Sequence, residues 1–163
     1  MTKTKTIAQL MTKHPLTIGY EEAIQKASEV MLEHHFRHLP VTDQIGDVIG
    51  ILSDRDIQRA MEVRRHGIET ETVIASHRKV KDFMSWPAHT VGDHTTLRDV
   101  LNLMIKEKIS AVLVSAEITG KVRGIITSED LLKEFERLLN EDEGEDVIPV
   151  IPGGKDPANI FRD

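Results

Sequence analysis

The stretch GIITSEDLL, residues 124–132, repeats a pattern that the chain has already used in GILSDRDIQ, residues 50–58. Each stretch reads as a glycine, two aliphatic residues, a hydroxyl residue, two polar positions, an aspartate and an aliphatic residue. The equivalent residues lie 74 positions apart: Gly50 and Gly124, Ser53 and Thr127, Asp56 and Asp130. A hydroxyl and a carboxylate three residues apart therefore occur twice in the same local setting.

The similarity extends upstream, where LMTKHPLTI (10–18) matches FMSWPAHTV (83–91) at an offset of 73. The offset grows by one residue between TDQIGDVIG and SAEITGKVRG, which both contain a glycine between apolar runs and are typical of hairpin loops. Because an insertion is tolerated best in such a turn, we interpret the chain as an internal duplication.

Each repeat predicts the same order of elements. A short extended piece around Thr17 or Thr90 precedes an amphipathic helix, two strands rich in β-branched residues follow, and a second helix closes the unit. In the second repeat the first helix carries a stripe at helical spacing, formed by Leu97, Val100, Leu101 and Met104. A single unit would have too small a sheet to be stable, so we expect an α+β fold in which two units pack sheet to sheet and share one core.

The predicted organisation is a first repeat over 1–63, a linker over 64–79, a second repeat over 80–139 and a tail over 140–163. The linker is polar and has only modest helical or strand signal. The tail begins with acidic residues and continues as VIPVIPGGKDP, which is not a helix. Its segment VIPVI is apolar enough to dock on a partner subunit, and disorder is the alternative.

Composition excludes several classes of protein. The 163 residues are 39% hydrophobic, 29% charged and only 4% aromatic, so the core is expected to be aliphatic. The absence of cysteine excludes disulfides, thiolate metal sites and cysteine nucleophiles. A net charge of -6 argues against nucleic acid as a partner. Neither a signal peptide nor a membrane-spanning apolar run is evident, so we predict a soluble cytoplasmic protein with no membrane partner.

The repeated hydroxyl–carboxylate pair has two interpretations. A serine or threonine three residues before an acid, just ahead of an apolar helix, is typical of a helix N-cap. The pair also follows a strand directly, where helix N–H groups can receive a phosphate, and a carboxylate can accept hydrogen bonds from two ribose hydroxyls. Gly50 and Gly124 indicate close approach of another group to the strand. Together these features favour a nucleotide.

The residues RHLPVTD, GDVIGILSDRDI and ISAVLVSAEITGKVRGIITSEDLL resemble a tandem pair of CBS domains (the cystathionine-β-synthase type), also called a Bateman module, over residues 7 to about 139. The resemblance implies two β-α-β-β-α units packed pseudosymmetrically through their sheets. It also implies clefts between the repeats for adenosyl ligands, namely AMP, ADP, ATP or S-adenosylmethionine. A free-standing regulatory module that forms a homodimer is the corresponding expectation.

The resemblance implies that both repeats contribute to each cleft. One cleft would contain Ser53, Arg55, Asp56, His89, Ile109, Ser110 and Ala111. The other would contain Leu16, Phe36, Arg37, His38, Thr127 and Asp130. The aspartates would hold ribose, the hydroxyl residues would approach phosphate and the strand-entrance residues would enclose adenine. Two acids, Asp54 and Glu129, are expected close to the phosphate positions.

Other functions are less well supported by the sequence. His34 and His38 are four residues apart, but no third ligand is evident and His38 is expected to begin a strand, so we predict no metal site. We find no phosphate loop or paired acid and base, and predict neither enzymatic activity nor a cofactor other than a regulatory nucleotide. The remaining alternative is a structural dimerisation or protein-interaction module without a ligand, with an unidentified protein partner.

Overall fold

The computed structural model describes residues 5–66, 69–74 and 77–142. The elements up to residue 59 are α1 (Ile7–Leu10), β1 (Thr12–Lys13), β2 (Ile18–Gly19), α2 (Ile24–His34), β3 (His38–Thr42), β4 (Val48–Ser53) and α3 (Asp54–Arg59). A hairpin and a 3-10 turn follow, namely β5 (Met61–His66), β6 (Glu69–Ile74) and η1 (Val80–Asp82). The remaining elements are β7 (Thr90–Gly92), α4 (Leu97–Glu107), β8 (Ala111–Ser115), β9 (Val122–Thr127) and α5 (Ser128–Asp142).

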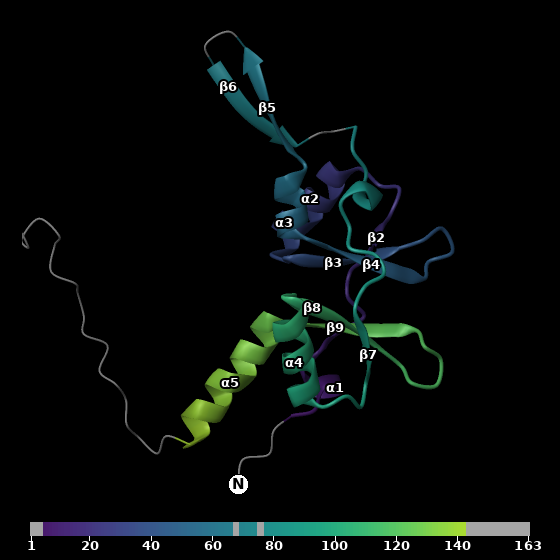
Figure 1. Ribbon diagram of the computed structural model, residues 1–163, viewed down its shortest axis with the longest axis vertical. Helices are drawn as coiled ribbons and strands as arrows, with labels where there is room; N and C mark the ends of the chain where they lie inside the picture. The colour runs from purple at the N-terminus through teal and green to yellow at the C-terminus, as the bar shows by residue number, and fades with distance from the viewer. Residues whose placement is uncertain (1–4, 67–68, 75–76, 143–163) are drawn as a thin grey trace, which may run out of the picture.

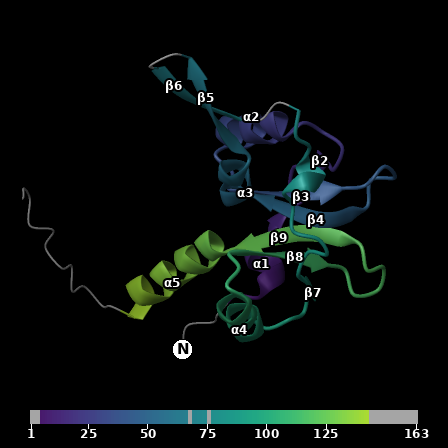
Figure 2. The ribbon, with the colours of Figure 1, turned by 45° about the horizontal axis from the view of Figure 1, so that its top comes forward.

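The two halves have the same sheet topology. In the first, β2 pairs parallel with β3, and β3 pairs antiparallel with β4. In the second, β7 pairs parallel with β8, and β8 pairs antiparallel with β9. Figures 1 and 2 show the two sheets against each other, with α2 and α3 on one outer side and α1, α4 and α5 on the other. The predicted α+β fold of two β-α-β-β-α units, joined through their sheets, is confirmed.

The buried apolar residues form three clusters rather than the one shared core that we expected. One lies under α2 and α3 and is centred on Ile24, Leu39 and Leu52. A second lies under α4 and α5 in the other half. The third lies between the two sheets and includes Leu113. Since each sheet is apolar on both faces, it is sandwiched between its own helices and the opposite sheet.

The first segment of each repeat (residues 7–13 and 80–86) packs on the opposite half, and we call these two the exchanged segments. Strand β1 pairs antiparallel with β9, which makes the second sheet four-stranded. Ile7 of α1 is fully buried in the second half's cluster, while Val80 of η1 is fully buried in the first half's cluster. Ser85 also exchanges backbone hydrogen bonds with Ile51 of β4. The sequence repeats and the packed halves are therefore offset, and each half is completed by the other.

The close approach predicted at the two strand glycines exists, but the chain's own backbone makes it. A Cβ at Gly50 would lie 2.8 Å from the carbonyl oxygen of Ser85. A Cβ at Gly124 would lie 2.8 Å from the carbonyl oxygen of Thr12 and 2.6 Å from Sδ of Met11. Our interpretation of these glycines as evidence for a ligand is wrong, because the exchanged segments occupy that space.

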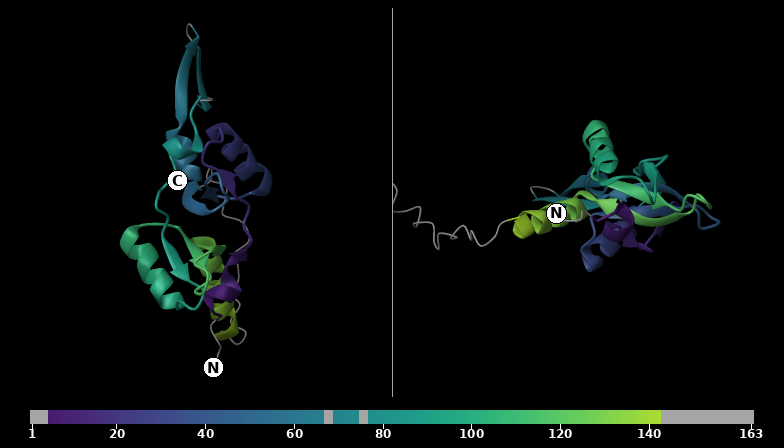
Figure 3. Two further views of the ribbon diagram at one scale, coloured as in Figure 1. Left: turned by 90° about the vertical axis from the view of Figure 1, so that its right-hand side faces the viewer. Right: turned by 90° about the horizontal axis from the view of Figure 1, so that it is seen from below.

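A hairpin begins at Met61, in the last residues of the predicted first repeat, and runs on into the predicted linker. Strands β5 and β6 pair antiparallel in an unbroken register from Met61 opposite Ile74 to His66 opposite Glu69. Figures 1 and 3 show this hairpin projecting from the end of the molecule that carries α2 and α3. The charged composition of the segment concealed its strand character. The tail segment VIPVI lies outside the described residues.

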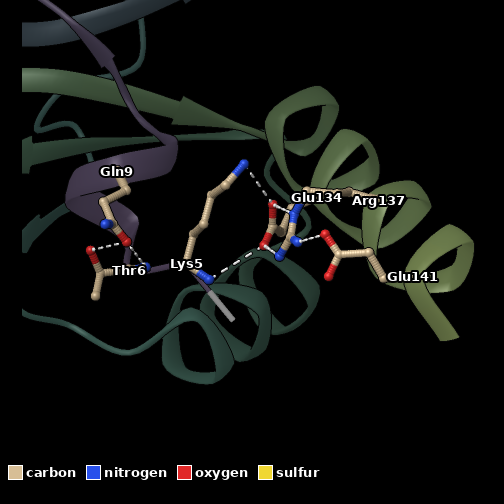
Figure 4. Close-up of polar contacts among 6 residues, drawn as sticks. All are labelled: Lys5, Thr6, Gln9, Glu134, Arg137 and Glu141. Carbon is tan, nitrogen blue, oxygen red and sulfur yellow. Dashed lines mark hydrogen bonds and ion pairs between the residues drawn. The ribbon is translucent and has the colours of Figure 1, made fainter. Parts of the chain in front are cut away.

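A buried carboxylate joins the start of the described chain to α5 (Figure 4). Glu134 is only 2% exposed, and its oxygens accept hydrogen bonds from Nε and Nη2 of Arg137 at 2.9 and 2.6 Å. The backbone N–H and the Nζ of Lys5 each lie 3.3 Å from the same carboxylate. The Arg137 hydrogen bonds lower the pKa of Glu134 to about 2, against the opposing effect of burial. This network holds α5 against the N-terminal segment.

Candidate functional site

Both hydroxyl–carboxylate pairs form helix caps. The backbone N–H and the Oγ1 of Thr127 both donate to Oδ2 of Asp130 at 2.8 Å, and Asp130 N–H donates back to Oγ1 at 3.4 Å. In the first repeat, the N–H and Oγ of Ser53 donate to Oδ2 of Asp56 at 2.7 Å. The N-cap interpretation is therefore confirmed in both copies. A ligand could bind only the carboxylate oxygens that the caps do not engage.

The two caps differ in their second carboxylate oxygen. Nη2 of Arg59 lies against Oδ1 of Asp56, so both oxygens of this carboxylate are engaged, and Asp56 is only 6% exposed. Within the described residues, no donor contacts Oδ1 of Asp130. Asp130 thus keeps one oxygen available to a ligand. A ligand of Asp56 would have to displace Arg59 from Oδ1.

The Asp130 cleft is a cavity of about 510 Å³ between the repeats. This volume lies within the usual range of small-molecule sites. All six residues predicted for this cleft line it: Leu16, Phe36, Arg37, His38, Thr127 and Asp130.

The Asp56 cleft is a larger cavity of about 1010 Å³ on the other side of the sheet interface. All seven residues predicted for it line its wall: Ser53, Arg55, Asp56, His89, Ile109, Ser110 and Ala111. The resemblance to the CBS family thus predicted two sets of residues that the fold brings together, each drawn from both repeats.

The helix ends explain why the strand entrances reach the clefts. Helix α2 is followed by the C-cap residue His35 and α4 by the C-cap residue Lys108, and both have left-handed backbone, with φ of 56° and 55°. A left-handed cap stops a helix and turns the chain sharply. The next residues, beginning with Phe36 and Ile109, then run into β3 and β8 along the cavity walls. The ring of Phe36 stacks on His34 at 5.6 Å between centroids.

The two acids expected near the phosphate positions are paired with cations. Nε of Arg37 lies 2.8 Å from Oδ2 of Asp54. Burial raises the pKa of Asp54, but the hydrogen bond and charge of Arg37 outweigh it, so the pKa is below its ordinary value. Nζ of Lys133 lies 2.7 Å from Oε1 of Glu129, and this hydrogen bond lowers the pKa of Glu129. Both acids are therefore charged but locally compensated.

A shared wall separates the cavities. His38, Arg55 and Ser110 line both of them. Nε2 of His38 lies 2.9 Å from Oγ of Ser110, and this hydrogen bond crosses from one repeat to the other. Burial lowers the pKa of His38, with Asp54 opposing the shift, so the imidazole is mostly neutral at pH 7.

Several lining residues were missed. The Asp56 cavity also contains Trp86 and Met84 from the exchanged segment, together with the cations Arg59 and Lys108. Trp86 gives this cleft an aromatic side chain, as Phe36 does in the other cleft. Two signals could have found the cations: Arg59 follows Asp56 by three positions, and Lys108 is the repeat equivalent of the capping residue His35.

The described residues do not assemble a metal site. Among them no three histidine, aspartate or glutamate side chains gather in an arrangement suited to a metal ion. His34 is the last residue of α2 and His38 is the first residue of β3, so these two histidines do not share the helical face that a metal site would need. In the same part of the chain, every helix is too short or too polar to cross a bilayer.

Two β-α-β-β-α units of the same topology, with clefts between them, form a domain pair. Comparison with known families identifies the kind of domain. A family model for the CBS domain matches residues 7–63 and 80–137. The chain belongs to the CBS domain family.

Three relatives illustrate the similarity. A conserved protein from Pyrococcus horikoshii has a solved structure with a TM-score of 0.68 and 29% identity, covering 84% of this chain and 96% of that one. The CBS domain pair of protein MJ0100, solved with methylthioadenosine and S-adenosyl-L-methionine, has a TM-score of 0.66 and 26% identity, covering 80% and 99%. An L-aspartate semialdehyde sulfurtransferase from Methanocaldococcus jannaschii is 30% identical over 132 residues, which are 79% of this chain.

The match to the sulfurtransferase covers only 23% of that enzyme's length. The same share applies to a homoserine O-acetyltransferase from Methanocorpusculum labreanum, which is 30% identical over 126 residues and 77% of this chain. The names of these enzymes therefore do not indicate an activity for this chain. The CBS pair is in general a regulatory module.

Proposed function

We propose that the chain is a regulatory module that binds adenine nucleotides in the clefts between its two CBS repeats. The observation that carries the proposal is the Asp130 cleft. There a carboxylate with one available oxygen lies on the same cavity as an aromatic ring, Phe36, and the entrance of strand β3. A carboxylate suits ribose hydroxyls, an aromatic ring suits a base, and a cation suits phosphate.

The ligand class rests on the adenosyl part. The similar MJ0100 domain pair was solved with two adenosyl compounds, methylthioadenosine and S-adenosyl-L-methionine. We favour AMP, ADP or ATP for this chain because arginine and lysine side chains, among them Arg55 and Lys108, line the cavities. S-adenosylmethionine is the alternative, and it would meet these cations with a positive charge of its own.

Melting temperature measured with and without nucleotide tests this function. AMP at a hundredfold excess over its Kd is expected to stabilise the protein by about 2.7 kcal/mol, a rise of roughly 5–10 °C. GMP should give a much smaller rise, because guanine would leave exocyclic groups unpaired in an apolar slot at about 1–3 kcal/mol each. S-adenosylmethionine is the third ligand in the series. Equal shifts with AMP and GMP would contradict adenine selectivity, and no shift with any ligand would contradict the function.

A second candidate function is self-association, which the described surface favours at one place. A cavity of about 480 Å³ between α4 and α5 is lined almost entirely by apolar side chains. Several of them are exposed: Ile105 at 73%, Leu132 at 66% and Phe135 at 58%. A groove of this kind marks a surface that buries itself against a partner. We propose a homodimer that forms through this groove, and it is compatible with nucleotide binding.

Phe135→Glu is expected to convert this dimer into a monomer, because it places a charge in the middle of the groove. Light scattering at micromolar concentration measures the mass. Glu136→Lys is a matched control on the exposed side of the same helix and should leave the mass unchanged. A wild-type protein that is already monomeric would contradict the dimer.

A further inference from the structure

The two clefts share a wall of side chains. His38 contributes from the entrance of β3 and Ser110 from the entrance of β8, and the two side chains are hydrogen-bonded at 2.9 Å. Arg55, the second residue of α3, lines the cavity on each side of this wall. Ligands in the two clefts would therefore face the same guanidinium.

The other cations of the Asp130 cavity are already paired. Arg37 is bonded to Asp54 at 2.8 Å, and Lys133 to Glu129 at 2.7 Å. Arg55 is exposed, and no acid among the described residues lies within ion-pair distance of it. Of the arginines and lysines that line this cavity, Arg55 is thus the one whose charge is not committed within the described structure.

The Asp56 cavity depends less on Arg55 as a source of uncommitted positive charge. Arg59 is committed to Asp56. Lys108 lines this cavity but not the other, and the described residues offer it no acid partner. A phosphate in the Asp56 cavity could bind Lys108 or Arg55. In the Asp130 cavity, Arg55 is the lining arginine or lysine that is not already paired with an acid of the described structure.

We propose that Arg55 couples the two clefts, so that phosphate-bearing ligands bind with negative cooperativity while uncharged adenosyl ligands bind independently. This inference rests on the proposed nucleotide function. A guanidinium presents its donors in one plane and binds one phosphate in a bidentate manner. Once it is engaged by the first phosphate, the second ligand binds without it and beside an added negative charge.

The experiment compares AMP with adenosine, which has the same base and ribose but no phosphate. Calorimetric titration gives two stepwise dissociation constants for each ligand. Adenosine reports the intrinsic inequality of the clefts, and the ratio of the two AMP constants should exceed the adenosine ratio by about tenfold. In Arg55→Gln the ratio of the two AMP dissociation constants should equal the ratio of the two adenosine constants. The first AMP dissociation constant should rise about tenfold, while both adenosine constants stay unchanged.

Lys106→Gln is the matched control, since it removes the same charge from an exposed position outside both cavities, and it should behave as wild type. If the protein binds two adenosine molecules but only one AMP, the coupling is supported, because the first AMP then prevents the second from binding. Equal AMP and adenosine ratios in the wild type, an unchanged AMP titration in Arg55→Gln, or a single site for both ligands would overturn it. If neither ligand binds at all, the proposed function falls, and the inference with it.

Discussion

Asp130→Ala is expected to weaken AMP binding ten- to a hundredfold. The uncommitted Oδ1 of Asp130 is the group that we assign to the ribose hydroxyls, and the loss of those hydrogen bonds should cost about 1.5–3 kcal/mol. Isothermal titration calorimetry measures the effect. Because Asp130 also caps α5, alanine removes a cap worth about 1 kcal/mol of stability. Asp130→Asn keeps an oxygen for the cap and should weaken AMP binding as well, which separates binding from folding.

Asp56→Ala is the matched comparison, and we expect it to weaken AMP binding less. Both oxygens of Asp56 are already engaged, Oδ2 by Ser53 and Oδ1 by Arg59, so a ribose there has to displace an ion pair. An aromatic side chain does not distinguish the two clefts, because Phe36 lines one cavity and Trp86 lines the other. If Asp56→Ala abolishes the tighter site and Asp130→Ala leaves it intact, the ranking is wrong.

The duplication is the reason that so much of the fold could be predicted. Alternation and helical spacing are local signals, and two copies allow each weak signal to be checked against its equivalent. The strands 38–42 and 111–115 and the helices that precede them lie where the pattern places them. The membership of the clefts was predicted from the resemblance of these motifs to the CBS family.

The features that were missed depend on tertiary contacts. Nothing local to residues 7–13 indicates that they complete the second sheet, because β1 is only two residues long and its partner β9 is more than a hundred positions away. Trp86 escaped notice for a similar reason, since its repeat equivalent is Lys13 and the comparison offers no matching aromatic residue.

The ion pairs that each acid and cation form could not be predicted from the sequence either. Asp56 and Asp130 occupy the same motif, and the cations three positions later, Arg59 and Lys133, are equivalent in the repeat. Arg59 bonds to Asp56, whereas Lys133 bonds to Glu129 instead of Asp130. The equivalent of Glu129 in the first repeat is Arg55, so no acid stands at that position, and the neighbouring Asp54 is bonded to Arg37. This difference in partners makes the two clefts unequal.

Arg137→Ala is expected to lower the free energy of unfolding at pH 7, and to lower it clearly more than substitution of its exposed partner Glu141 does. The substitution leaves the carboxylate of Glu134, which is 2% exposed, with only Lys5 to compensate it. Removing one partner of a buried ion pair is costly because the other charge stays buried. Urea denaturation measures the loss. Glu141→Ala removes the exposed partner of the same arginine and should cost less than about 0.5 kcal/mol.

The pH dependence of this loss identifies its cause. The pKa of Glu134 is lowered from 4.5 to about 2 in the folded protein, so its ionised form contributes stability above pH 4.5 and that contribution is lost as the pH falls toward 2. In Arg137→Ala the folded pKa of Glu134 moves back toward or above its ordinary value, which removes this contribution at every pH. The gap between wild type and variant should therefore narrow between pH 4.5 and 2. A gap that stays constant over this range would mean that Arg137 acts through the packing of its stem on α5, and that the charge of Glu134 is not what holds the helix that carries Asp130.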